Sequence, residues 1–187
     1  IEARQSEVRV SELSESLDHL SMIPPGRSHA NEYHTTIMGL LSAIFYPHLV
    51  YPKKEQDISE GRKRIDISYT NRATSGFFHA LPMFHDIKCP YVMVECKNYE
   101  EDLANPEIDQ LLGRFSKHRG EFGLLVCRNV QNKEAMLSRS RDTVRDDRGY
   151  IIVLDDNDIR TLVEAVANGN PAEVDKLLEQ KLREILM

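Results

Sequence analysis

The stretch YVMVECKN at residues 91–98 predicts a buried strand that carries an ionisable pair. Side chains alternate between the two faces of a strand, so Glu95 and Lys97 should project from the same face, within about 7 Å of each other. The opposite face would be apolar. A charged pair in such an apolar strand costs desolvation free energy unless a ligand or partner binds it. We therefore expect this strand to carry chemistry.

A second strand is expected just upstream, in GRKRIDISYT at residues 61–70. The same alternation predicts that Ile65 and Ile67 point to one face and Asp66 to the other. If the two strands pair, Asp66 meets the ionisable pair over one patch. The pattern thus predicts two carboxylates and a lysine at one place.

Two carboxylates beside a lysine suit a divalent cation. Asp66 and Glu95 supply the hard oxygen ligands that Mg²⁺ accepts, and the backbone carbonyl of Cys96 lies between them as a further ligand. A cation there lowers the pKa of water and stabilises charge on a scissile phosphate. Lys97 would position the water or stabilise the transition state. These parts fit hydrolysis of a phosphodiester.

The Glu-x-Lys triplet alone is a weak signal. A second copy, Glu179–Gln180–Lys181, lies in a segment expected to be helical, where the spacing has no such meaning. What distinguishes the first copy is its strand, the aspartate on the preceding strand and the helix expected after it. The alternative interpretation is a surface ion pair on a sheet edge, a common and weak interaction.

The other segments predict an α/β domain whose core elements follow in the order helix, three strands, helix, strand, helix, strand, helix. Residues 1–22 form a first helix with an apolar stripe, a coiled-coil seam or docking face, and a Pro-Pro-Gly break follows. The remaining expectations are a helix ending before Pro47, strands at 48–54, 62–69, 91–98, 121–128 and 150–155, helices at 106–118 and 131–146, an ambiguous segment at 72–85, and two helices within 157–187. We expect a three-layer αβα sandwich with a central mixed sheet and extra N- and C-terminal helices. The domain division is 1–25 helix and linker, 26–156 core, 157–187 helical extension.

Composition sets limits on the function. The chain has 187 residues, 41% hydrophobic and 29% charged, with no apolar run long enough to span a membrane. Three scattered cysteines without a CxxC pair argue against a disulfide scaffold or a zinc site and for a reducing, cytoplasmic compartment. The net charge of −6 argues against nucleic acid. However, residues 53–72 hold six basic and four acidic residues (+2), and residues 114–148 hold nine and five (+4). Such stretches can face phosphate or be solvated surface.

Asp66 followed by Glu95–Cys96–Lys97 resembles the motif of the PD-(D/E)XK nuclease superfamily, which has the restriction-endonuclease-like fold. The resemblance covers about residues 29–155 and implies a helix, a three-stranded meander with the aspartate on its second strand, and the Glu-x-Lys on its third. It also implies a metal-site glutamate in the helix before the meander, matched by Glu32, and a glutamine in the helix after the motif, matched by Gln110. The alternatives are a first-turn acid favoured by the helix dipole and a helix-flank residue.

The sequence departs from the family pattern at two positions. Arg64–Ile65 precedes the aspartate where the family name has proline, and Arg114 stands where one branch has tyrosine. Membership of that branch is therefore unsupported.

The resemblance implies a metal-dependent nuclease using Mg²⁺, with Mn²⁺ as a substitute, acting on DNA rather than RNA. The expected phosphate contacts are basic: Arg62, Lys63, Arg64, Arg114, Lys117 and Arg119. Because the chain starts at Ile1, we expect a fragment joined to an upstream domain, as in an effector module of a defence or restriction system. The first helix or the C-terminal helices could form a homo-oligomer. Two alternatives stay open: a catalytically silent nuclease-like fold that binds nucleic acid or a protein partner, and a scaffold domain.

Overall fold

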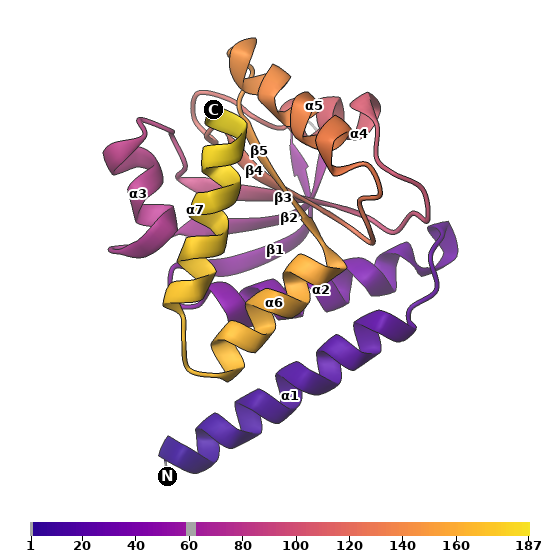
Figure 1. Ribbon diagram of the computed structural model, residues 1–187, viewed down its shortest axis with the longest axis vertical. Helices are drawn as coiled ribbons and strands as arrows, with labels where there is room; N and C mark the ends of the chain where they lie inside the picture. The colour runs from indigo at the N-terminus through magenta and orange to yellow at the C-terminus, as the bar shows by residue number, and fades with distance from the viewer. Residues whose placement is uncertain (1, 59–62) are drawn as a thin grey trace.

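The computed structural model describes residues 2–58 and 63–187, and for residues 2–10, 57, 58 and 63 it describes the backbone alone. Five strands form one sheet in the order β1-β2-β3-β4-β5 (Figure 1). They are β1 (Leu49–Ile58), β2 (Lys63–Asn71), β3 (Tyr91–Lys97), β4 (Phe122–Cys127) and β5 (Tyr150–Asp155). The pairs β1–β2 and β2–β3 are antiparallel, and β3–β4 and β4–β5 are parallel. The sheet is therefore mixed, as predicted.

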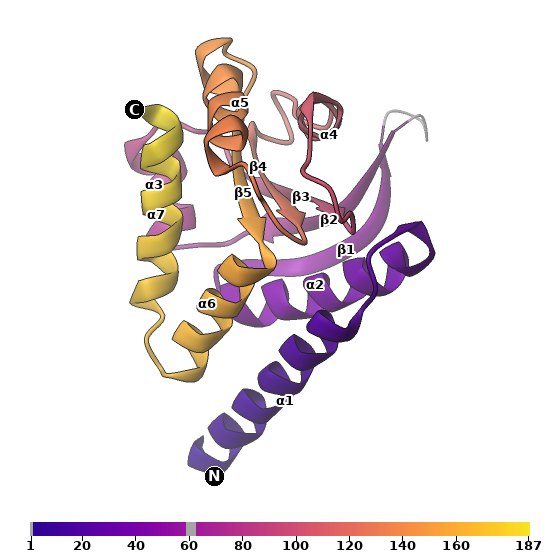
Figure 2. The same ribbon diagram turned by 45° about the vertical axis from the view of Figure 1, so that its right-hand side comes forward.

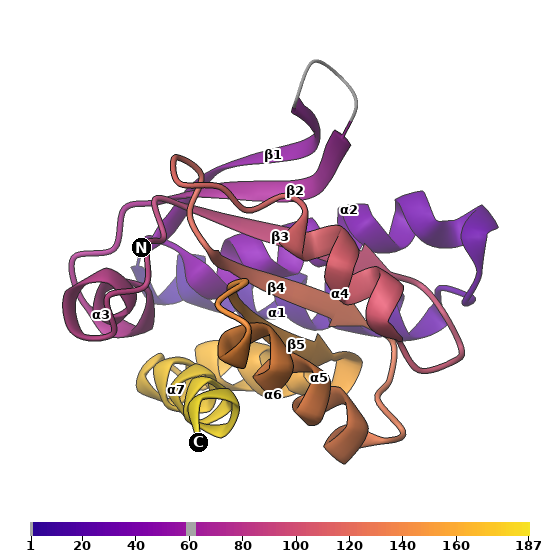
Figure 3. The same cartoon turned by 90° about the horizontal axis from the view of Figure 1, so that it is seen from above.

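Helices cover both faces of this sheet. They are α1 (Glu2–Met22), α2 (Ala30–Phe45), α3 (Gly76–Phe84), α4 (Asn105–Leu112), α5 (Lys133–Arg145), α6 (Asp156–Ala167) and α7 (Ala172–Leu186), with a short 3₁₀ helix η1 (Arg27–His29) before α2. One buried cluster joins the sheet to α1, α2, α3, α6 and α7, and a second joins its other face to α4 and α5. Figure 3 shows α4 and α5 on the side of the sheet away from α2. The predicted α/β architecture, a mixed sheet between helical layers, is confirmed.

The central strands are buried along almost their whole length. Every residue of β4 is buried, and in β3 only Tyr91 is exposed. Strands covered on both faces need apolar side chains on both faces, which explains the continuous apolar run in FGLLVC. Glu95 and Lys97 are the ionisable exceptions in β3, and both are buried. The strand is thus a core element that also carries charge.

The first helix packs onto the rest of the chain. Leu13, Leu17 and Leu20, three members of the predicted stripe, are buried. The helix that carries them contacts α2 and α6 (Figure 2). The side chain of Val10, the fourth member, lies outside the described part. Arg128, after β4, donates from Nη1 to the Leu20 carbonyl oxygen at 3.1 Å. The apolar stripe therefore packs against other helices of the same chain. No helix in the described part of the chain is long and apolar enough to cross a membrane.

Three expected elements differ in extent. The ambiguous segment forms helix α3, with Pro82 inside it, and β1 continues to Ile58. The helix expected to reach residue 118 ends at Leu112, so that prediction is wrong at its C-terminal end. Gly113 is its C-cap, and a tight turn follows in which Ser116 bridges Gly120, whose φ is 101°. A positive φ suits glycine at Gly120, which closes this turn before β4.

The side chains of β2 do not alternate as expected. Ile67 packs in the cluster on the α2 side, whereas Ile65 packs with Met93 in the cluster on the α4 side. The prediction that the two isoleucines share a face is therefore wrong. On the neighbouring strand, Glu55 has a φ of 54° between the pairs that bring Lys54 to Ile67 and Gln56 to Ile65. A residue in the left-handed region interrupts the pleat of β1, the strand that pairs with this part of β2.

Candidate active site

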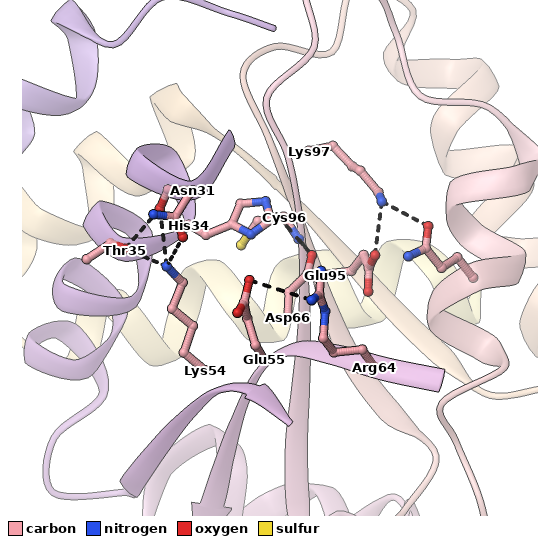
Figure 4. Close-up of polar contacts among 11 residues, drawn as sticks. Asn31, His34, Thr35, Lys54, Glu55, Arg64, Asp66, Glu95, Cys96 and Lys97 are labelled. Carbon is pink, nitrogen blue, oxygen red and sulfur yellow. Dashed lines mark hydrogen bonds and ion pairs between the residues drawn. The ribbon is translucent and has the colours of Figure 1, made fainter. Parts of the chain in front are cut away.

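Strand β3 and helix α4 together hold the lysine of the motif. Lys97 Nζ donates to Glu95 Oε1 at 2.9 Å and to Gln110 Oε1 at 2.9 Å (Figure 4). Glu95 and Lys97 share a face because they are two residues apart on a strand. Gln110 reaches them because α4 lies over that face of β3. The structure thus brings together three of the predicted site residues.

Asp66 lies where the ladder between β2 and β3 ends. The regular pairing stops at Ile67 and Val94. Beyond this pair, a side chain accepts the hydrogen bond in place of a backbone carbonyl: Asp66 Oδ2 accepts the backbone N–H of Cys96 at 3.0 Å. This bond ties the aspartate to the middle of the Glu-x-Lys motif. The predicted meeting of Asp66 with the motif is therefore present, although the β2 faces differ from the expected ones.

The two carboxylates influence each other electrostatically. Burial raises the pKa of Glu95 to about 7, and the charge of Asp66 adds to this, whereas Lys97 lowers it. Burial lowers the pKa of Lys97, but Glu95 and Asp66 outweigh that effect and leave the pKa raised. The ammonium group therefore stays protonated. Glu95 is 0% exposed, and its Oε2 is buried without a hydrogen-bond partner among the described residues.

Helix α2 contributes a residue that the sequence did not single out. His34 Nε2 lies 4.0 Å from Asp66 Oδ2, and its side chain is 16% exposed. Burial lowers the pKa of His34, while Asp66 and the Cys96 backbone raise it less. Figure 4 shows the ring beside Asp66 and Cys96. The signal available in the sequence was its position on the helix before the meander.

The predicted helix glutamate lies elsewhere. Glu32 contacts His19 Nε2 at 3.1 Å and His29 Nδ1 at 3.4 Å. Residues 32 and 34 are two positions apart on a helix, so about 200° of rotation separates them. Because His34 faces Asp66, Glu32 points toward α1 and η1. The structure does not bring Glu32 to the carboxylates.

An arginine nitrogen is also buried close to the motif. Arg114, in the turn after α4, lies near enough to lower the pKa of Glu95. Its Nε is buried without a partner in the described part of the chain. Arg119 Nε donates to the Arg114 carbonyl oxygen at 2.8 Å. Two of the predicted phosphate contacts are thereby linked in one turn.

The remaining predicted phosphate contacts lie farther out. Arg64 is exposed and lies 3.9 Å from Glu55, and Lys117 is exposed. Arg62 and the side chain of Lys63 lie outside the described residues. Lys54, not predicted individually, donates from Nζ to the Asn31 and Thr35 side chains at 2.6 and 2.7 Å, on the His34 side of the site. Cations thus flank the carboxylates on both sides.

The donor set fits a small divalent cation. Asp66 and Glu95 offer carboxylate oxygens, and Glu95 Oε2 is a buried oxygen without a partner among the described residues. Mg²⁺ is often held by one or two carboxylates, with water and substrate phosphate completing its shell. Within residues 2–58 and 63–187 no group of three or more His, Cys, Asp or Glu side chains could hold a metal ion. The protein's own contribution would therefore be these two carboxylates and backbone oxygen.

Comparisons with known proteins give one structural likeness. No protein-family model matches the chain, and no curated protein matches it. Among solved structures, the chain is similar to the MspJI restriction endonuclease in complex with a 27-mer oligonucleotide, at a TM-score of 0.45 and 14% identity. The match covers 94% of this chain and 35% of the other, so the chain spans about a third of the length of the protein it matches.

Proposed function

We propose that the chain is a metal-dependent nuclease that hydrolyses phosphodiester bonds, acting on DNA rather than RNA and as an endonuclease. The observation that carries this proposal is the buried Glu95 carboxylate, which lies beside Asp66 and 2.9 Å from Lys97. Buried charges without structural need are costly, so such a cluster marks a functional site. As an expectation from the family resemblance, the domain would be an effector module of a larger protein of the defence or restriction type.

Each residue has a role that its position allows. Asp66 and Glu95 would hold Mg²⁺, or Mn²⁺ in its place, together with the Cys96 carbonyl oxygen. When bound, the cation would activate water and stabilise charge on the phosphate. Lys97 would orient the attacking water or stabilise the negative charge of the transition state.

Positioning residues complete the site. Gln110 fixes the ammonium group of Lys97 through its 2.9 Å hydrogen bond. Arg114, beside Glu95, would attract the phosphate, and Lys117, Arg119 and Arg64 would contact the backbone farther along. Glu32 would act on the metal only if it moved away from His19 and His29, so we assign it no role in this arrangement.

The experiment is a cleavage assay with a matched pair of variants. Supercoiled plasmid and linear DNA are incubated with Mg²⁺, Mn²⁺ or EDTA, and Glu95→Gln is compared with Glu179→Gln. Both changes remove one carboxylate from a Glu-x-Lys triplet, but Glu179 lies on α7 next to His85. We expect metal-dependent cutting that Glu95→Gln abolishes and Glu179→Gln leaves intact. Cutting that survives Glu95→Gln would refute the assignment of the site.

A second candidate is a nuclease-like domain that binds nucleic acid or a protein partner without cutting. The position of Lys97 favours this second candidate, because its ammonium group at 2.9 Å already neutralises the Glu95 carboxylate without a metal ion. The two candidates differ in metal binding. Calorimetric titration with Mn²⁺ should give heat that Glu95→Gln removes if the domain is a nuclease, and no heat if it is silent.

A further inference from the structure

A pocket with polar and apolar lining lies on the α4 side of the sheet, next to the strands that carry the two carboxylates. It has a volume of about 220 Å³. Its lining comes from β1, β2, β3 and the turn before β4: Tyr51, Lys53, Gln56, Ile65, Ser68, Tyr69, Thr70, Tyr91, Met93 and Arg119. Figure 3 shows the loop between α4 and β4 reaching over β2 on this side. A volume of this size holds several water molecules and has room for one planar ring system.

Two tyrosines at the pocket are exposed. Tyr51 is 68% exposed and Tyr91 is 44% exposed, although both belong to strands of the central sheet. Tyr51 has a φ of 53°, next to the register shift between Val50 and Lys53. A tyrosine in the left-handed region is strained, and bulges often redirect a side chain near a functional site. The β1 strand thus presents an aromatic ring at the rim at a cost in backbone strain.

The polar lining is basic and neutral. Lys53 and Arg119 supply two positive charges, and there is no acidic residue among the described residues that line the pocket. Arg119 is held in place by its bond to the Arg114 carbonyl oxygen. Gln56 Oε1 accepts from Ser68 Oγ at 2.7 Å, which fixes an amide group in the wall. Such a lining suits a flat, neutral ring that bears an anionic group.

The pocket adjoins the candidate active site. Met93, in its wall, precedes Glu95 by two residues on the same face of β3, a separation of about 7 Å along the strand. Arg119 is bonded to Arg114, which lowers the pKa of Glu95. A group in the pocket would therefore lie about one nucleotide from a phosphate at the carboxylates.

We propose that this pocket receives the base of one unpaired nucleotide next to the scissile phosphate. Tyr51 and Tyr91 provide faces for stacking, Lys53 and Arg119 attract the phosphates, and Gln56 meets the edge of the base. Aromatic stacking is tolerant of base identity, because every base has a π-face. The substrate class is therefore nucleic acid that is single-stranded at the cleavage position. The nearness to cleavage rests on the proposed nuclease function, but base binding does not.

The test measures binding without metal. Fluorescence anisotropy in EDTA compares a labelled short oligothymidylate with an oligonucleotide of the same length and charge whose nucleotides are abasic. The proteins are the wild type, Tyr51→Ala, Tyr91→Ala, the corresponding Tyr→Phe variants, and Phe84→Ala. Phe84 is 78% exposed on α3 and does not line the pocket, so it is a matched control for loss of an exposed ring.

We expect the wild type to bind the thymidylate more tightly than the abasic chain. Loss of either tyrosine ring should weaken thymidylate binding by about 5- to 100-fold and leave abasic binding unchanged. The Tyr→Phe variants and Phe84→Ala should bind like the wild type. Equal affinity of the wild type for the two oligonucleotides, or an unchanged preference in both Tyr→Ala variants, would overturn the proposal.

The outcome is separable from that of the cleavage assay. Base-dependent binding by Glu95→Gln, with cleavage abolished, supports both proposals. Base-dependent binding in a wild type that never cuts supports the pocket and refutes the nuclease. Cutting of duplex DNA without base-dependent binding supports the nuclease and refutes the pocket.

Discussion

Glu95–Cys96–Lys97 on β3 and Glu179–Gln180–Lys181 on α7 have the same spacing of acid and base in different surroundings. On the strand, Glu95 and Lys97 share a face and lie 2.9 Å apart. On the helix, two residues are separated by about 200°, so Glu179 lies 4.0 Å from His85 while Lys181 lies 2.8 Å from Asp158. The backbone decides whether the triplet forms a pair.

The two triplets also differ in burial. Glu95 is 0% exposed, whereas the Glu179 side chain is 45% exposed. Exposed ion pairs are screened and weak, while a buried charge changes the pKa of its neighbours. The Glu-x-Lys triplet alone does not indicate a functional site, but the same triplet on a strand covered on both faces does. The following predictions test this difference, beginning with the largest effect.

The first prediction concerns catalysis. Lys97→Met should lower the rate of metal-dependent cleavage by about 100- to 1,000-fold, the effect of removing one group that stabilises transition-state charge. Lys181→Met should leave the rate unchanged, because Lys181 contacts Asp158 far along the chain. Initial rates of plasmid cleavage measure both. Similar losses in the two variants would show that burial of the triplet does not matter.

The second prediction concerns stability. Lys97→Met should reduce the free energy of unfolding by about 3 kcal/mol, because it leaves the buried Glu95 carboxylate without its cation. The double variant Glu95→Leu with Lys97→Met should recover most of this loss, since an apolar pair suits the buried face. Urea unfolding at pH 8 measures both, and Lys181→Met should cost less than about 1 kcal/mol. A double variant as unstable as the single one would contradict the argument.

The third prediction concerns the residue after the strand triplet. Asn98 donates from Nδ2 to the Pro24 and Gly26 carbonyl oxygens at 2.9 and 3.0 Å and is 2% exposed. Asn98→Ala should lower the free energy of unfolding by about 2 kcal/mol, since it removes both hydrogen bonds that the buried amide donates to the segment before α2. Asn157→Ala, at an exposed position of α6, is the control. A cost below about half this value in thermal unfolding would mean that water replaces the lost bonds.

The sequence predicted the features that depend on burial of a strand. The pairing of Lys97 with Glu95 followed from alternation, and the motif located Asp66 and Gln110 correctly beside it. The end of α4 was not predictable in the same way. Phe115 continues the apolar stripe of the helix, yet it reaches its cluster from a turn. Periodicity detects burial, and a turn can bury a side chain as well as a helix can.

Local backbone geometry limited the prediction of β2 and of the helix residue. Ile65 and Ile67 pack in different clusters opposite Glu55, a left-handed residue of β1, and no glycine in the sequence marks that position. His34 and Glu32 both lie on the first two turns of α2, and only the crossing of that helix over Asp66 selects the histidine. Such choices depend on the placement of elements far apart in the chain. The sequence did not indicate Tyr51 and Tyr91 as pocket residues for the same reason.

The shared cluster of α1, α2, α6 and α7 affects the order in which the chain can fold. Leu40 and Leu41 of α2 are buried in the same cluster as Leu178 and Leu182 of α7, so long-range contacts complete that face of the sheet. During synthesis at about 5–20 residues per second, the early helices would wait roughly ten seconds or more for these partners. Until then their apolar faces are accessible to chaperones and to other nascent chains. Slow closure of this layer, more than the carboxylate site, should set how well the protein can be produced.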